Sequence, residues 1–97
     1  MPLYITLINY TDQGIKNIKG APQRVAAARE AVKRAGGKLL SYHLTLGLYD
    51  AVVVVEAPSD EVYAGMILSI SQQGNVKTLT LKAFSEEESF RIFGKLS

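Results

Sequence analysis

Residues 47–57 read Gly-Leu-Tyr-Asp-Ala-Val-Val-Val-Val-Glu-Ala and contain the longest apolar run of the chain. Ala51 to Ala57 predict a strand, and an almost continuously apolar strand is typical of one covered on both faces. The four residues before it, Gly47 to Asp50, predict a tight connection, and Lys38 to Leu46 predict the preceding strand. We therefore expect a β-hairpin in the middle of the chain.

Two further strands are predicted outside this hairpin. Leu3 to Asn9 and Val76 to Phe84 are rich in β-branched, aromatic and other apolar residues, which favour pleated, half-buried surfaces. The segment between Tyr10 and Ala21 holds two glycines and several polar residues, so we expect a long connection with about one helical turn in it.

Helices are predicted in the remaining segments. One begins near Pro22, which suits a first helical turn, and ends at Gly36-Gly37. A second follows Ser59, an N-cap residue with acidic residues behind it. A short third one begins after Ser85, where Ser85 and Glu88 have capping-box spacing. The apolar stripes of the first two helices comprise Val25, Ala28, Val32 and Ala35, and Val62, Tyr63, Met66, Ile67 and Ile70.

The predicted order is β-α-β-β-α-β with a C-terminal helix, which is the split-βαβ or ferredoxin-like pattern of the α+β class, with a four-stranded antiparallel sheet. The 97 residues of the chain suffice for one domain, residues 1–97, and are too few for two. A chain of this size buries only about 60–65% of its unfolded surface. We therefore expect it to pair with a copy of itself, as a homodimer or higher homo-oligomer.

Composition excludes several classes of protein. The chain has no cysteine and a single histidine, so it lacks disulfides, zinc–cysteine sites and iron–sulfur clusters, and we expect neither a metal nor another cofactor. Its 11 basic and 9 acidic residues are scattered, which predicts no nucleic-acid footprint. No apolar stretch approaches the ~20 residues of a membrane span, and no signal-peptide pattern is present. We expect a cytoplasmic protein without membrane contact.

Alternation along the strands divides the sheet into two faces. We expect the aliphatic sets, such as Leu3, Ile5 and Leu7 or Leu79 and Leu81, to lie under the helices. The open face would then have hydroxyl groups, tyrosine rings and an imidazole. Pairing with a second copy through this face would leave an apolar cavity with a few polar groups in its wall. A one-residue bulge would invert this assignment. The residues expected on the open face are Tyr4, Thr6, Ile8, Tyr10, Ser41, His43, Thr45, Thr78 and Thr80.

An ordered set of motifs resembles the GYD-domain family. The family is named for a glycine–tyrosine–aspartate signature, represented here by Gly47, Tyr49 and Asp50. The resemblance implies a ferredoxin-like fold related to the dimeric α/β-barrel proteins, a group of cofactor-free monooxygenases, lactone isomerases, haem enzymes and amino-acid-binding regulatory modules. It implies no particular activity, and His43 stands where the family usually has an aromatic residue. The motifs are Asn9–Gly14, Gly36–Lys38, Gly47–Val54 and Ala57–Asp60.

Two residues are candidates for proton transfer. His43 has a side chain whose ordinary pKa suits acid–base catalysis, and Asp50 could orient a ligand or His43 itself. The alternative is structural: His43 packs at an interface, and Asp50 bonds the amides of its turn.

A second set of residues is predicted to bind a ligand. Four of them are polar residues at the end of the first strand, beside a glycine loop, a place that suits ligand contact. For Asn9 and Thr11 the alternative is that they only satisfy loop amides. Tyr42 and Tyr49 are predicted to donate a hydrogen bond to the ligand, and the alternative for Tyr49 is that it plugs an end of the barrel. The set is Asn9, Tyr10, Thr11, Gln13, Tyr42 and Tyr49.

Three functions remain open at this point. The chain is interpreted first as a homo-oligomeric small-molecule-binding domain with a sheet-face cavity. The alternatives are a cofactor-independent enzyme, resembling an isomerase or monooxygenase, that acts on a small organic substrate, and a purely structural assembly module. Whether it is an enzyme is left undecided.

Overall fold

The computed structural model describes all 97 residues, and its element order confirms the predicted ferredoxin-like βαββαβ pattern. A two-part helical segment, α1 followed by a 3-10 turn, occupies the expected long connection between the first strand and the first long helix. The elements are β1 (Leu3–Tyr10), α1 (Asp12–Lys16), the 3-10 turn Ile18–Gly20, α2 (Ala21–Arg34), β2 (Lys38–Leu44), β3 (Ala51–Glu56), α3 (Asp60–Ser71), β4 (Val76–Ala83) and α4 (Glu86–Gly94).

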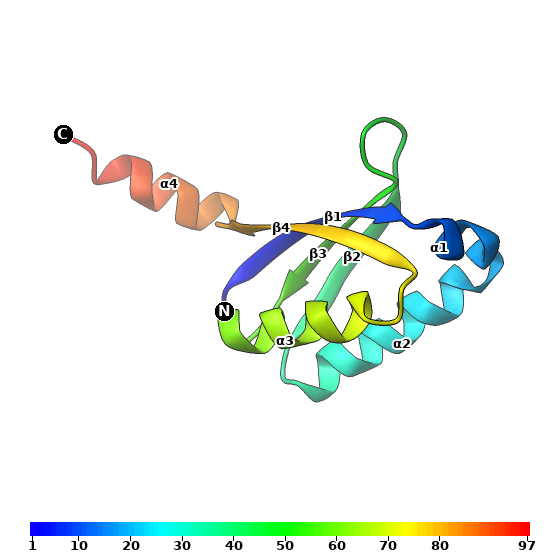
Figure 1. Cartoon of the computed structure of the whole chain (residues 1–97). Helices are drawn as coiled ribbons and strands as arrows, with labels where there is room; N and C mark the ends of the chain where they lie inside the picture. The colour runs from blue at the N-terminus through cyan, green and yellow to red at the C-terminus, as the bar shows by residue number, and fades with distance from the viewer.

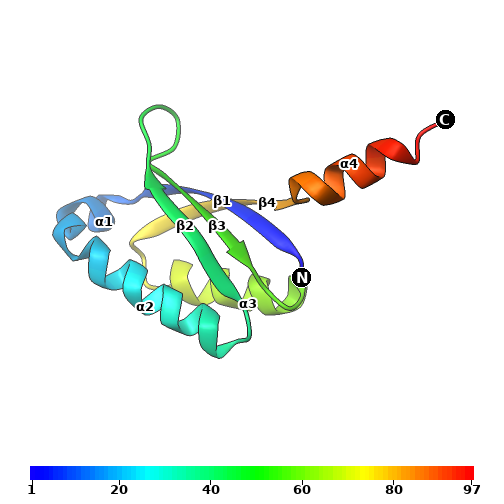
Figure 2. The same ribbon diagram turned by 180° about the vertical axis from the view of Figure 1, so that it is seen from behind.

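The four strands form one antiparallel sheet in the order β2-β3-β1-β4. In Figure 1, α2 and α3 lie side by side under one face of this sheet, and no helix covers the other face. Figures 1 and 2 both show α4 leading away from the body of the domain beyond the end of β4. We refer to the two sides of the sheet as the helix face and the open face. None of the helices combines the length and the apolar character needed to cross a bilayer.

The helix ends follow the predicted capping chemistry. The Ser59 side chain accepts from the Val62 N–H at the start of α3, and Ser85 and Glu88 form the complete capping box of α4. Gly36 has a φ of 91°, the left-handed conformation that lets the chain leave α2 without a Cβ clash.

The expected assignment of the two faces is wrong for β1 and β4. Tyr4, Thr6, Ile8 and Tyr10 lie on the helix face, beside Thr78 and Thr80 of β4, whereas the aliphatic sets lie on the open face. Strand pairing places the open-face residues in three rows across the sheet. The rows are His43-Val52-Leu7-Leu79, Ser41-Val54-Ile5-Leu81 and Lys38-Glu56-Leu3-Ala83.

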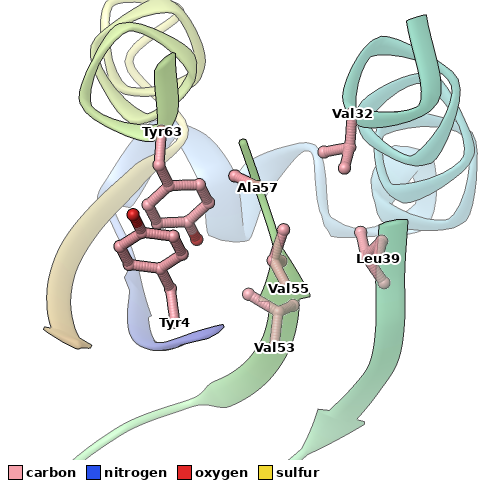
Figure 3. Close-up of a cluster of buried hydrophobic side chains, with 7 residues drawn as sticks. All are labelled: Tyr4, Val32, Leu39, Val53, Val55, Ala57 and Tyr63. Carbon is pink, nitrogen blue, oxygen red and sulfur yellow. The ribbon is translucent and has the colours of Figure 1, made fainter. Parts of the chain in front are cut away.

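Hydrogen bonding explains why the hydroxyls lie under the helices. Tyr63 of α3 stacks on Tyr4 (Figure 3). The ring centroids are 4.3 Å apart, and the Tyr63 hydroxyl lies 2.6 Å from Thr6 Oγ1. Thr6 Oγ1 also lies 2.9 Å from Thr80 Oγ1, and Tyr4 donates to Asp60 at 2.5 Å. These buried hydroxyls therefore have partners, without which their burial would be unfavourable.

A β-bulge in β2 shifts the register between Leu39 and Ser41. Leu39 pairs with Val55 and Tyr42 pairs with Val53, so both lie on the helix face although they are three residues apart. Simple alternation places these two residues on opposite faces, and the extra residue in the strand changes that parity. Ser41 and His43 remain on the open face, as predicted.

Candidate functional site

A cavity of about 400 Å³ lies between the helix face of the sheet and the two long helices. It is lined by 24 residues, of which 17 are hydrophobic, so its wall is mostly apolar with a few polar groups. This volume lies within the range of small-molecule sites. This cavity lies on the opposite side of the sheet from the one expected between two paired open faces.

Small side chains on α2 leave this space unfilled. Where a packed core helix would have leucine or isoleucine, α2 has Ala27, Ala28 and Ala31 along the cavity. The opposite wall is formed by Met66 and Ile67 of α3, which also pack against the buried core.

Two predicted ligand-binding residues meet in the cavity. The hydroxyls of Tyr10 and Tyr42 are hydrogen-bonded to each other, and both residues line the cavity wall. Burial is the larger of two causes that raise the pKa of Tyr42 well above its ordinary value, and the hydrogen bond with Tyr10 is the second. The phenol therefore stays protonated, and it is a hydrogen-bond donor at neutral pH.

Asp50 supports this tyrosine pair from the end of the sheet. Its Oδ2 accepts from the backbone N–H of Tyr10 at 2.9 Å, and its own N–H donates to the Ile8 carbonyl at 2.8 Å. The carboxylate thus fixes the end of β1 where it meets the β2–β3 loop. Tyr49 lies in that loop, and its carbonyl accepts from Thr45 Oγ1 at 2.6 Å.

The polar residues after β1 tie α1 to the turn before β4. Thr11 Oγ1 donates to the Gly74 carbonyl at 2.6 Å and caps α1 by accepting from the Gly14 N–H. Gln13 Nε2 donates to the Gln73 carbonyl at 2.8 Å. These bonds satisfy loop groups, which was the alternative to ligand binding for Thr11.

His43 and Asn9 are separated from the cavity by the sheet. Both lie on the open face, where His43 pairs with Val52 and Asn9 pairs with Lys77. The structure gives no hydrogen bond between His43 and Asp50, so it does not bring the two candidate catalytic residues together. It also has no group of three or more His, Cys, Asp or Glu side chains arranged to hold a metal ion.

Arg24 is a cavity residue that we did not single out from the sequence. It lines the cavity near the start of α2, and its Nη2 atom is buried without a hydrogen-bond partner. A signal was present, because Arg24 precedes Ala28 by four residues and Val32 by eight. This spacing places a charged side chain on the apolar stripe of the helix.

The structure defines an α+β, ferredoxin-like domain, and comparison with known proteins identifies its family. The GYD domain model matches residues 4–92, so the chain belongs to the GYD-domain family, as its motifs predicted. A relative, the glutamine synthetase and cystathionine beta-lyase binding protein of Thermus thermophilus, is 34% identical over 84 residues. The match covers 86% of this chain and 88% of the relative.

A crystal structure of a Thermus thermophilus protein has the same fold. It superposes with a TM-score of 0.55 at 24% sequence identity, covering 88% of this chain and 95% of the other. This similarity supports the ferredoxin-like architecture described above.

Proposed function

We propose that this chain is a homo-oligomeric small-molecule-binding protein. Two copies pair through the open faces of their sheets, and each copy holds a small, largely apolar molecule in the cavity on its helix face. The observation that carries the proposal is that the sheet has apolar side chains on both faces. The helices cover one of these faces, over an unfilled cavity, and nothing within the subunit covers the other.

The open face has the character of an interface. Two of its three rows, the ones that begin at His43 and at Ser41, have aliphatic residues from β3, β1 and β4. Leu79 and Leu81 in these rows are 48% and 49% exposed in the single subunit. A contiguous apolar patch of this kind marks an interaction surface in a soluble protein. A second copy supplies an identical apolar surface, and two-fold pairing of identical patches is the commonest way to cover one.

The dissociation constant of the dimer tests the pairing. Leu81→Ala removes a side chain that is half exposed in the subunit, so it forfeits about 1 kcal/mol of burial in each copy. A two-fold interface contains the residue twice, which gives about 2 kcal/mol and a roughly 30-fold weaker dimer.

Leu68→Ala is the matched control, because Leu68 is 69% exposed on α3, away from the open face. Sedimentation equilibrium should give wild-type affinity for this variant and weaker association for Leu81→Ala. A monomeric wild-type protein, or equal effects of the two substitutions, would overturn the pairing.

Filling the cavity tests the small-molecule site. Ala28→Leu places a larger side chain where α2 lines the empty space, and it should abolish the binding of any molecule held there. The control Ala26→Leu changes an exposed position on the same helix that does not line the cavity. Equal binding by both variants, measured by calorimetric titration, would place the molecule elsewhere.

A second candidate function is binding to another protein, which the name of the Thermus relative suggests for that protein. Two exposed apolar segments of this chain favour it. Leu46 and Leu48 at the β2–β3 loop are 100% and 89% exposed, and α4 has exposed Phe90 and Phe93 without one buried residue. Phe90→Asp with Phe93→Asp should then abolish co-sedimentation with purified glutamine synthetase, while Leu68→Asp should leave it unchanged.

A further inference from the structure

The cavity has hydrogen-bond donors gathered at one end, and no carboxylate in its wall matches them. Arg24 is the first of these donors. Its Nη1 donates to the Asn17 carbonyl at 3.0 Å, whereas its Nη2 is buried and makes no hydrogen bond. A charged N–H that has lost water without gaining a protein acceptor is unfavourable, and such groups are rare in folded proteins.

The tyrosine pair supplies a second donor. When one phenol of the Tyr10–Tyr42 pair donates to the other, the accepting phenol keeps its own proton available. Arg24 acts electrostatically on Tyr42, where its positive charge lowers the pKa of the phenol against the stronger effect of burial. Arg24, Tyr10 and Tyr42 also line the same cavity, so one ligand in this space can meet the guanidinium and the phenol pair.

The remaining charges around this end do not complete the pairing. Asp50 is the neighbouring carboxylate, and its Oδ2 already accepts the backbone N–H of Tyr10. The rest of the wall is mostly apolar, with the alanines of α2 facing Met66 and Ile67 of α3, and its polar members carry no negative charge. These polar members are Thr6, Arg34, Ser69, Gln73, Asn75 and Thr78. This end of the cavity therefore combines positive charge and phenol protons with an apolar space beside them.

We propose that the cavity ligand is a small organic acid, with its carboxylate held by Arg24 Nη2 and the free phenol proton of the Tyr10–Tyr42 pair, and its apolar body lying between α2 and α3. This inference rests on the small-molecule site of the proposed function and names the class of molecule that the site takes. Arginine suits the role because its planar N–H groups match carboxylate geometry.

An acid and its neutral isostere test the inference. Indole-3-acetate and indole-3-acetamide have the same aromatic body and differ in the charged group, and binding is followed by isothermal titration and by ¹⁵N-resolved shifts of α2 amides. Wild-type protein should bind the acid at least about tenfold more tightly than the amide, since hydrogen bonds to charged groups are the stronger ones. Arg24→Gln should remove this preference by weakening the binding of the acid at least about tenfold, while the affinity for the amide changes much less.

Controls separate the possible failures. Arg29→Gln alters an exposed arginine on the same helix that does not line the cavity, and it should keep the preference for the acid. Circular dichroism establishes that Arg24→Gln is folded. Equal binding of acid and amide by the wild type would overturn the carboxylate assignment and leave the cavity site standing. Binding of neither probe would overturn both, and so would binding that Ala28→Leu does not block.

Discussion

Gly14 gives the sharpest quantitative test of how the loop after β1 is held. It is buried in α1, and a Cβ built on it would lie 2.0 Å from the carbonyl oxygen of Asn75. That oxygen accepts from the Thr11 N–H at 3.0 Å, so the close approach of the two backbones is also a hydrogen bond. Ordinary carbon–oxygen contacts lie at about 3.3–3.6 Å. Gly14→Ala must therefore push α1 away from this turn by more than about 1 Å.

The cost follows from three effects. Overpacking costs about 1–3 kcal/mol, and weakening the Thr11–Asn75 bond costs about 1 kcal/mol more. The higher helix propensity of alanine stabilises the folded state by about 1 kcal/mol and offsets part of this loss. We expect the free energy of unfolding to fall by about 1–3 kcal/mol in urea denaturation, and Tm to fall by at least about 4 °C in a domain of this size.

Gly65→Ala is the matched control for this substitution. Gly65 lies inside α3, and a Cβ built on it would meet nothing within 4 Å. The same chemical change should therefore stabilise the protein by about 0.5–1 kcal/mol through helix propensity alone. If Gly14→Ala proves as stable as Gly65→Ala, the close contact between α1 and the turn before β4 does not exist, and the reasoning is refuted.

Two further predictions concern the hydroxyls under the helices. Thr6→Val leaves the buried Tyr63 hydroxyl without its 2.6 Å partner, so the free energy of unfolding in urea should fall by about 1–3 kcal/mol. Thr80→Val, at the exposed end of the same network, should lower it by less, and equal losses would contradict this network. Burial, with the Asp60 hydrogen bond second, raises the pKa of Tyr4 from 10.0 to about 12. Its contribution to stability is therefore complete below pH 10 and is lost between pH 10 and about 12, so the free energy of unfolding should fall over this interval, and Tyr4→Phe should flatten that part of the pH profile. The hydrogen bond from Tyr4 lowers the pKa of Asp60, so its contribution is present above pH 3.8 and is lost in acid.

The order of elements could be predicted because each segment has its own local signal. The hairpin strands differ from their neighbours in apolar density, Pro22 and Gly36 mark the ends of α2, and Ser85 with Glu88 marks the start of α4. Each of these signals lies within a few residues of the element that it marks. They do not depend on contacts with distant parts of the chain, so they can be recognised in the sequence.

The assignment of the two faces could not be obtained in the same way. Alternation correctly separated Leu3, Ile5 and Leu7 from Tyr4 and Thr6, yet both sets are apolar enough to be covered. The choice depended on a partner far along the chain, since Tyr63 supplies the hydroxyl that Thr6 needs. A tyrosine within the apolar stripe of a helix was the available signal, because its hydroxyl requires a polar group on the sheet beneath it.

The misassigned face of β1 also limited the prediction of the site. Alternation with Ser41 and His43 correctly puts Tyr42 on the helix face, but Tyr10 was expected on the open face, whereas in the structure both tyrosines line the cavity under the helices. The bulge changed only the face of Leu39, and no residue from Leu39 to Ser41 is a glycine or proline that would have marked it. The tyrosine pair was therefore predicted as two separate ligand contacts and not as one hydrogen-bonded unit.

Separating the two faces also separates the two proposed roles. The sequence interpretation required one surface both to pair with a second copy and to bind a ligand. Polar groups that bind a ligand weaken an apolar interface, and an apolar interface leaves few groups for a ligand. In the structure, consecutive residues of β1 face opposite sides, so Leu7 contributes to the aliphatic open face while Ile8 borders the cavity. The polar Ser41 and His43 lie at the β2 end of these aliphatic rows, so pairing through β1, β3 and β4 buries fewer polar groups than the expected arrangement, and an unpartnered buried hydroxyl would weaken the interface. The ligand site, in turn, keeps its tyrosines in a wall whose shape is set within one subunit, so occupancy of the cavity does not depend on the distance between two copies.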